Sequence, residues 1–183
     1  MPIRKLMIAF AAAAMLLAVA ACNIQHQKDG DKEKVNIQTP VGGIKVNTDA
    51  DVKDVGLAVY PGAQRRQKNE GGDHNSANVN ISSSLFGVKV VALEYTSNDS
   101  PEKIKEFYKK ELGKYGDVLD CKGGVHEDGN QIRCQEGQEH TDRTELVVGT
   151  KERQHIVSIK PSGNSGTEFG LVYVQTRGKE GAL

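Results

Sequence analysis

FGVKVVALEYT, residues 86–96, is the stretch of sequence that decides the fold. Apolar residues alternate over both of its faces, with Phe86, Val88, Val90 and Ala92 on one and Val91, Leu93 and Tyr95 on the other. Side chains of neighbouring residues in a strand point to opposite faces, and here both faces are apolar near the middle. The pattern therefore predicts a strand that is buried on both sides at its centre.

The residues that follow this strand predict a helix over 101–115. Ser100 suits the N-cap, Pro101 suits the first helical position, and Gly116 supplies a stop. Five apolar residues recur at helical spacing and form one stripe: Ile104, Phe107, Tyr108, Leu112 and Tyr115.

Further strand candidates lie on either side of this strand and helix. They are residues 79–85, 117–121, 131–135, 144–150, 155–160 and 169–176. Residues 57–176 are thus expected to form one α+β domain, in which an antiparallel sheet of about five to seven strands packs against one main helix. The last residues, 177–183, are expected to be a disordered tail.

The segment before this domain contains a second β signal. Val35 and Ile37, and then Ile44 and Val46, alternate with polar residues on either side of Pro40 and two glycines. This predicts a β-hairpin over 35–48 within a hairpin and connector segment, residues 35–56. Since a lone hairpin is marginal in water, it is expected to dock on the domain, to add an edge to a partner protein, or to stay partly dynamic.

The N-terminus has the layout of a bacterial secretory signal. Arg4 and Lys5 precede an apolar run over 6–19, and the small residues Ala20 and Ala21 end it. A run of about 14 residues is shorter than the roughly 20 that a membrane-spanning helix needs. Residues 1–21 are therefore predicted to be a signal peptide, and the polar residues 22–34 a flexible tether.

The end of this signal also resembles the lipobox of bacterial lipoproteins, because Val19, Ala20 and Ala21 precede Cys22. The resemblance implies a diacylglycerol on the Cys22 sulfur, cleavage before Cys22 and acylation (such as palmitate) of the new amino group. Asn23, rather than Asp, at the second position favours the outer membrane, facing the periplasm. The membrane, through the anchor, is then the first partner, and other envelope proteins are further candidates. An ordinary secretory signal that happens to contain a cysteine is the alternative.

A second resemblance covers residues 57–116. Tyr60-Pro61-Gly62-Ala63, followed by a strand, Ser100-Pro101-Glu102-Lys103 and a helix, is similar to a group of uncharacterised bacterial secreted proteins and lipoproteins. The likeness implies a fold and no catalytic residues.

Cys121 and Cys134 remain after Cys22 is set aside, and an even pair in an exported chain predicts one disulfide. A turn at Asp128-Gly129 would place the two cysteines nearly opposite each other in a hairpin. The alternative is a metal site made of Cys121, His126, Cys134 and His140, but its spacings match no familiar zinc pattern. Neither a metal nor a cofactor is predicted.

Charge, aromatic content and one short motif argue against three further classes of protein. The chain has 24 basic and 24 acidic residues; loss of Arg4 and Lys5 leaves 22 against 24, a net charge of −2, which argues against nucleic acid. The absence of Trp and an aromatic content of 5% argue against a carbohydrate-stacking platform. Ser100-x-x-Lys103 formally matches penicillin-interacting enzymes, but their Lys-Thr-Gly element is missing.

No catalytic residue is therefore predicted. The sequence favours a lipid-anchored envelope protein that acts as a non-enzymatic binding or structural module. A small hydrolase or a metal-dependent protein with an unrecognised site is the alternative.

Overall fold

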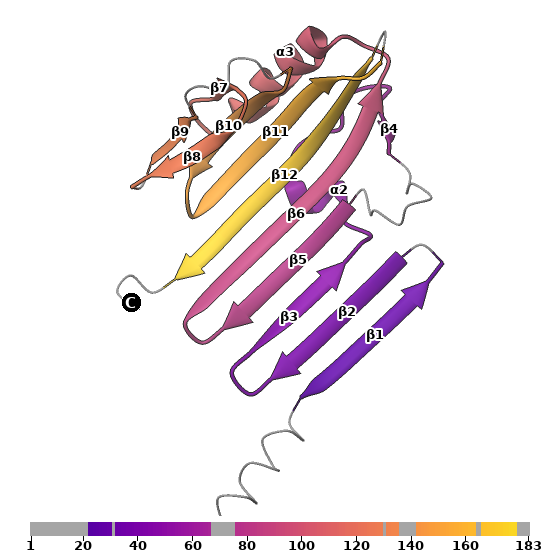
Figure 1. The fold of residues 1–183 in the computed structure, drawn as a ribbon, viewed down its shortest axis with the longest axis vertical. Coiled ribbons are helices and arrows are strands. Elements are labelled where there is room, and N and C mark those ends of the chain that lie inside the picture. Colours follow the sequence, from indigo (N-terminus) through magenta and orange to yellow (C-terminus); the bar gives the residue numbers. More distant parts are fainter. Residues whose placement is uncertain are drawn as a thin grey trace, which may run out of the picture.

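The computed structural model describes residues 22–30, 32–66, 76–129, 131–135, 142–163 and 166–178. These residues form a ten-stranded antiparallel sheet, a separate two-stranded sheet and two short helices (Figure 1). This content is consistent with an α+β class, but the sheet has more strands than the five to seven expected. The signal segment, residues 1–21, and His74, His140 and residues 179–183 lie outside the described residues.

The strands are β1 (Asn23–Asp29), β2 (Lys32–Thr39), β3 (Gly42–Asn47), β4 (Gln64–Arg65), β5 (Ser76–Ser83), β6 (Phe86–Ser97), β7 (Leu119–Lys122), β8 (Val125–Asp128), β9 (Gln131–Cys134), β10 (Thr144–Thr150), β11 (Arg153–Pro161) and β12 (Thr167–Gly178). The helices are α2 (Val52–Val55) and α3 (Pro101–Leu112). The large sheet has the order β1-β2-β3-β5-β6-β12-β11-β10-β7, with the short β4 also paired to β6; β8 and β9 form the two-stranded sheet.

The hairpin predicted over 35–48 is present as β2 and β3, and it docks on the domain because β3 pairs with β5. The tether expected over 22–34 is replaced by β1 and the start of β2, which pair from Asn23↔Gln38 to Asp29↔Lys32. All seven residues of β1 are exposed, so its place in the sheet depends on backbone pairing. Side-chain pattern carries no signal for such a strand, and tertiary pairing overrides its weak β propensity.

The core lies between α3 and strands β6, β10, β11 and β12, in the upper part of the sheet in Figure 1. Ile104, Tyr108 and Leu112, spaced four residues apart on α3, are fully buried. They share one cluster with sheet residues that include Val91, Leu93, Leu146, Val157, Ile159, Phe169 and Leu171. The Tyr108 hydroxyl accepts a hydrogen bond from the Tyr60 N–H and donates one to the Ala58 carbonyl, so the segment before β4 is fixed to the helix.

The helix ends at Leu112, three residues before the predicted end at 115. Gly113 is the C-cap, with right-handed φ and ψ, and its N–H donates to the Lys109 carbonyl. Ser100 holds the N-cap position, but its side chain caps no backbone N–H of the helix. Tyr115 therefore lies beyond the helix, where its hydroxyl donates to the Gly56 carbonyl.

Cys121 and Cys134 form a disulfide with a Cα–Cα distance of 5.2 Å. The two residues are not opposite each other in one hairpin, as the sequence had suggested: the residue opposite Cys134 is Val125, on β8, which the sequence pattern did not reveal. Cys121 lies on β7 of the large sheet. The bridge therefore connects the two-stranded sheet to the large one.

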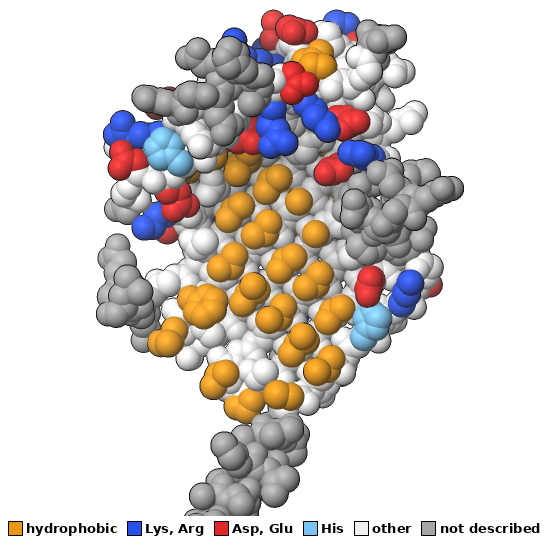
Figure 2. Space-filling model, viewed as in Figure 1, with side chains coloured by type: hydrophobic (Ala, Val, Ile, Leu, Met, Phe, Trp, Pro, Cys, Tyr) orange, Lys and Arg blue, Asp and Glu red, His pale blue; other side chains and the backbone are white. Residues whose placement is uncertain are grey.

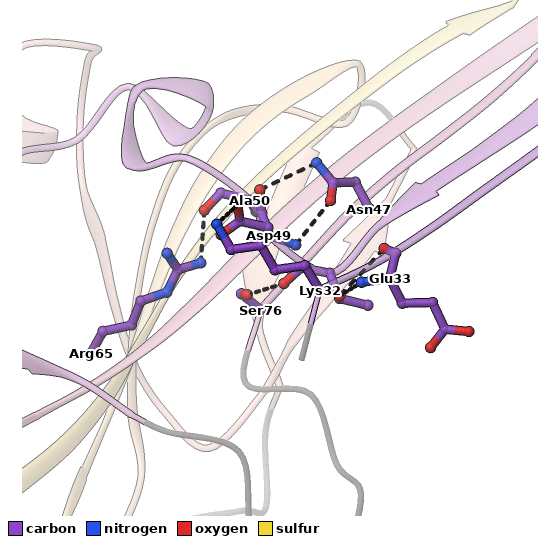
Figure 3. A network of polar contacts seen from close by, with 8 residues as sticks. Lys32, Glu33, Asn47, Asp49, Ala50, Arg65 and Ser76 are labelled. Atoms are coloured by element: carbon purple, nitrogen blue, oxygen red, sulfur yellow. Dashed lines mark hydrogen bonds and ion pairs between the residues drawn. The ribbon is translucent and has the colours of Figure 1, made fainter. Parts of the chain in front are cut away.

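A polar network joins the N-terminal strands to the core (Figure 3). Asn47, at the end of β3, donates from Nδ2 to the Asp49 carbonyl and accepts the Asp49 N–H at Oδ1. Lys32 Nζ lies 2.8 Å from the Asp49 carboxylate, and Arg65 donates to the Ala50 carbonyl. These contacts fix the chain where it leaves β3. Ala50, which follows Asp49, is already in the core.

Candidate functional site

The candidate site is the face of the large sheet that points away from α3, which we call the open face. Strand register arranges its side chains in cross-strand rows. One row contains Ile24, Ile37, Ile44, Ile81 and Val88. The next contains His26, Val35, Val46, Val79, Val90 and Val174. A third contains Ala77, Ala92, Val172, Ile156, Val147 and Leu119.

These rows make a continuous apolar surface, and Figure 2 shows hydrophobic side chains over the centre and the lower part of this face. Most of its residues are half-buried by their neighbours alone, and Ile44 is exposed. Both described helices contact the sheet from the other side, since Val55 of α2 and Ile104 of α3 belong to the core cluster. From β1 to β12, no described element covers the open face. Monomeric soluble proteins rarely expose a contiguous apolar patch of this extent without a partner.

The opposite side of the same N-terminal strands is polar. Between the apolar positions of β1, β2, β3 and β5 lie Gln25, Gln27, Lys34, Asn36, Gln38, Lys45, Asn47, Asn78 and Asn80. Antiparallel sheets with one polar and one apolar face normally bury the apolar face against a core. In this part of the molecule no described residues form a core against the apolar face.

β6 is fully buried on one side only, which corrects the prediction that its centre is buried on both faces. Leu93 and Tyr95, in its second half, are buried towards α3. Val88 and Val90, in its first half, belong to the open face and are only half-buried. An apolar side chain indicates that burial is favourable, but the pattern cannot tell whether an element or a partner supplies the cover.

Charged residues border the apolar surface in the part of the sheet that has α3 on its other side. Arg66 Nη1 lies 3.3 Å from Glu94 and 3.4 Å from Glu168, and Lys160 Nζ lies 2.9 Å from Glu168. The hydrogen bond from Lys160 keeps the pKa of the Glu168 carboxyl below its ordinary value. These side chains border a shallow hollow of about 220 Å³, whose lining also includes Ala92, Gly170 and Val172. The charges form a polar rim in which acidic and basic groups already compensate each other.

The disulfide closes the open face at its β7 end. Cys121 on β7 is opposite Glu145 on β10. The Cys121 side chain therefore points to the same side of the sheet as Glu145 and as Val147, two residues after Glu145. The bridge to Cys134 therefore places the β8–β9 hairpin on this side of the sheet. Val147 is fully buried although it does not belong to the core cluster, as expected if the hairpin covers it.

Cys22 directly precedes β1, the edge strand of the open face. It is exposed and its thiol is free. The start of β1, the β2–β3 turn and the β5–β6 turn lie at one end of the strands, which we call the Cys22 end (Figure 1). The remaining lipobox residues, 19–21, lie outside the described residues.

Two histidines of the domain, His155 and His126, have different surroundings. His155 lies between the rings of Tyr115 and Tyr173, with centroids 4.2 and 5.0 Å away. Burial lowers the pKa of its imidazole, and a hydrogen bond with the Val55 backbone opposes this effect. His126 is exposed on β8.

Both thiols of the alternative metal site are in the disulfide. Within the described residues, three or more potential metal ligands are nowhere grouped closely enough to bind an ion. The helices described here are also too short or too polar to cross a membrane.

Comparison of the chain with known protein families, curated proteins and solved structures gives no match. Function is therefore inferred from the residues themselves and from their arrangement. The pattern of a single strand does not reveal the open face, because the face forms only when several strands pair. The signal in the sequence is the repetition of Ile or Val at alternate positions in four strands, β2, β3, β5 and β6, with a polar residue between them.

Proposed function

We propose that this protein is anchored through acylated Cys22 in the bacterial outer membrane, faces the periplasm, and works there as a non-enzymatic binding module. The observation that carries the proposal is the uncovered apolar face that starts at the strand carrying Cys22. Hydrophobic association is non-directional and scales with the apolar area removed from water, so a face of branched aliphatic residues favours binding over chemistry.

A second copy of the chain is the occupant that we propose for the open face. Sheets pack face to face about 10 Å apart when their inner side chains interdigitate. Strands spaced by about 4.8 Å, most of which contribute two or three apolar residues, give the face from β1 to β12 an area on the order of 500 Å². Two copies would then bury on the order of 1,000–1,200 Å² together, which is the lower end of specific interfaces.

The anchor restricts how two copies can pair. A two-fold axis parallel to the strands keeps both Cys22 ends on one side, so both anchors reach the same membrane. It also places the two polar rims side by side, and each rim contains compensated pairs such as Arg66 with Glu94. A polar rim around an apolar centre is the usual anatomy of a protein interface.

Mass spectrometry of the protein extracted from cell membranes tests the anchor. The expected N-terminal peptide begins at Cys22 and carries the mass of the acyl groups. A Cys22→Ser variant should move to the soluble fraction. An unmodified Cys22 in the membrane-extracted protein would contradict the proposed anchoring.

Light scattering of the mature chain, residues 22–183 with Cys22→Ser, tests the occupant. The parent chain should be a dimer that dissociates on dilution. Val79→Asp introduces a charge at the centre of the open face and should give a folded monomer. Asn80→Asp introduces the same charge next to it on the polar side of β5, and should leave the dimer intact. A parent that is monomeric at every concentration, or a Val79→Asp variant that pairs as tightly as the parent, would overturn this assignment.

A further inference from the structure

Large exposed hydrophobic side chains gather at the Cys22 end of the sheet. Six such residues are exposed in the described part of the chain, and five of them are at this end: Ile24 (68% exposed), Val41 (77%), Ile44 (38%), Leu85 (58%) and Phe86 (50%). We call these five residues the tip. The sixth, Tyr115, lies behind the sheet near Gly56 and His155.

Strand register brings the tip together from three separate segments. Ile24 is opposite Ile37 near the start of β1, Val41 is in the β2–β3 turn, and Leu85 precedes Phe86 in the β5–β6 turn. Gly42 is opposite both Thr39 and Ser83, which aligns the two turns with each other. The chain from Cys22 enters the sheet at the same end (Figure 1), and Figure 2 shows hydrophobic side chains there.

The tip is free of charge in its own segments. Residues 23–25, 38–43 and 82–87 contain no acidic or basic side chain. Two cations border these segments: Lys45, which follows Ile44, and Arg177, whose guanidinium lies against Gly87. The acidic groups Glu94 and Glu168 are at the other end of the open face, by Arg66. The open face therefore runs from an apolar end beside Cys22 to a charged end away from it.

The two turns also satisfy part of their backbone internally. Ser83 Oγ accepts the N–H groups of Leu85 and Phe86 and donates to the Phe86 carbonyl. Thr39 Oγ1 donates to the Gly42 carbonyl. Unpaired backbone groups are costly to move from water into a lipid environment, so turns with this bonding are suited to enter one.

We propose that the tip inserts into the interfacial layer of the bilayer that holds the Cys22 anchor. This inference rests on the proposed lipid anchoring, which brings the tip to the membrane surface. The acyl chains already give stable anchoring, and insertion adds a contact between the folded domain and the same bilayer. It also fixes the strands at a steep angle to the membrane, with the open face along its side and the charged rim towards the periplasm.

Tryptophan fluorescence tests the inference, because the chain contains no Trp of its own. Phe86→Trp places a single probe in the tip, and Tyr115→Trp places one at a site of nearly equal exposure away from it. Cys22 is the only free thiol in the described residues, so the mature chain can be coupled through it to a maleimide lipid. Coupling gives a tether of known chemistry, whether or not cells acylate Cys22.

The coupled variants are reconstituted in phosphatidylcholine vesicles with and without brominated acyl chains. Emission from Phe86→Trp should move to shorter wavelength and lose most of its intensity to the bromine atoms. Emission from Tyr115→Trp should show neither change. Since bromine is present only on the lipid acyl chains, quenching separates insertion from pairing of two protein copies.

Two results would overturn insertion: unchanged Phe86→Trp emission on tethering, or equal quenching of both probes. Circular dichroism of each variant confirms that it is folded. A failure of the anchor itself is seen separately, as an unmodified Cys22 in the protein extracted from cells.

Discussion

The sheet has two regions that follow the same alternation but differ in what covers them. In the region beneath α3, apolar residues such as Leu93 and Leu171 point towards the helix and are fully buried. In the region from β1 to β5, the apolar side chains point the other way and meet no described element. β6 belongs to both regions, with Val90 on the open side and its neighbour Val91 in the core.

The difference separates the residues that hold this fold together from those that are available for binding. Stability comes mainly from apolar area removed from water, which is large beneath α3 and small over β1, β2 and β3. The N-terminal strands are held instead by backbone pairing and by the network of Asn47, Asp49 and Arg65 at their junction with the core. A region held in this way can present a binding face at little risk to the rest of the fold.

Replacing one isoleucine in each region should give the largest contrast. Ile104, on α3, is fully buried, so Ile104→Ala should lower the free energy of unfolding by about 2–5 kcal/mol. Ile81, on the open face, is only half-buried, so Ile81→Ala should lower it by about 1 kcal/mol or less in the monomer. Urea unfolding at low protein concentration measures both values. Equal losses would mean that the open face is covered within one chain.

Removing the disulfide should have a smaller effect. The bridge joins residues 13 apart, and loss of such a loop constraint lowers the free energy of unfolding by about 3 kcal/mol at most in the chain-entropy model. Cys121→Ala with Cys134→Ala should also free the β8–β9 hairpin from β7 and enlarge the uncovered area. Binding of a dye that fluoresces on apolar surfaces should therefore rise relative to the parent. Unchanged dye binding would show that other contacts hold the hairpin.

Much of the fold could be predicted because several elements carry strong local signals. β10 has the predicted bounds, 144–150, since Leu146, Val147 and Val148 stand between clear turns. The β2–β3 hairpin follows from alternation around Pro40. β1 and β8 carry no such signal. In β1, residues such as Gln25 and Gln27 show no apolar pattern, and the strand forms because β2 offers an edge.

The candidate site could be predicted only in part. Cys22 was identified because a short motif determines its chemistry, and its acylation remains a prediction. The open face depends on which strands are neighbours and in which register. Ile24, Ile44 and Ile81 are far apart in sequence, and only pairing through β2, β3 and β5 places them in one row. The sequence also cannot tell on which side of β6 the helix packs, and that choice decides which face stays open.

The smallest expected difference between the two regions is the loss of stability at low pH. His155 is buried on the α3 side, and burial lowers the pKa of its imidazole below the ordinary value of about 6.5. Below about pH 6.5 the unfolded chain therefore binds this proton more strongly than the folded chain, so stability falls as the pH decreases towards the folded-state pKa. His155→Gln should flatten this dependence between pH 8 and pH 5. Arg153, whose charge also lowers this pKa, stays in place in both proteins. Hydrogen-exchange protection, taken relative to the intrinsic exchange rate at each pH, should fall with acid in β10 and β11 of the parent more than in the variant, while the difference between the two proteins in β2 and β3 stays constant. An equal loss of protection in parent and variant would assign the acid sensitivity to other groups, because the pKa of His155 would then be the same in the folded and the unfolded chain.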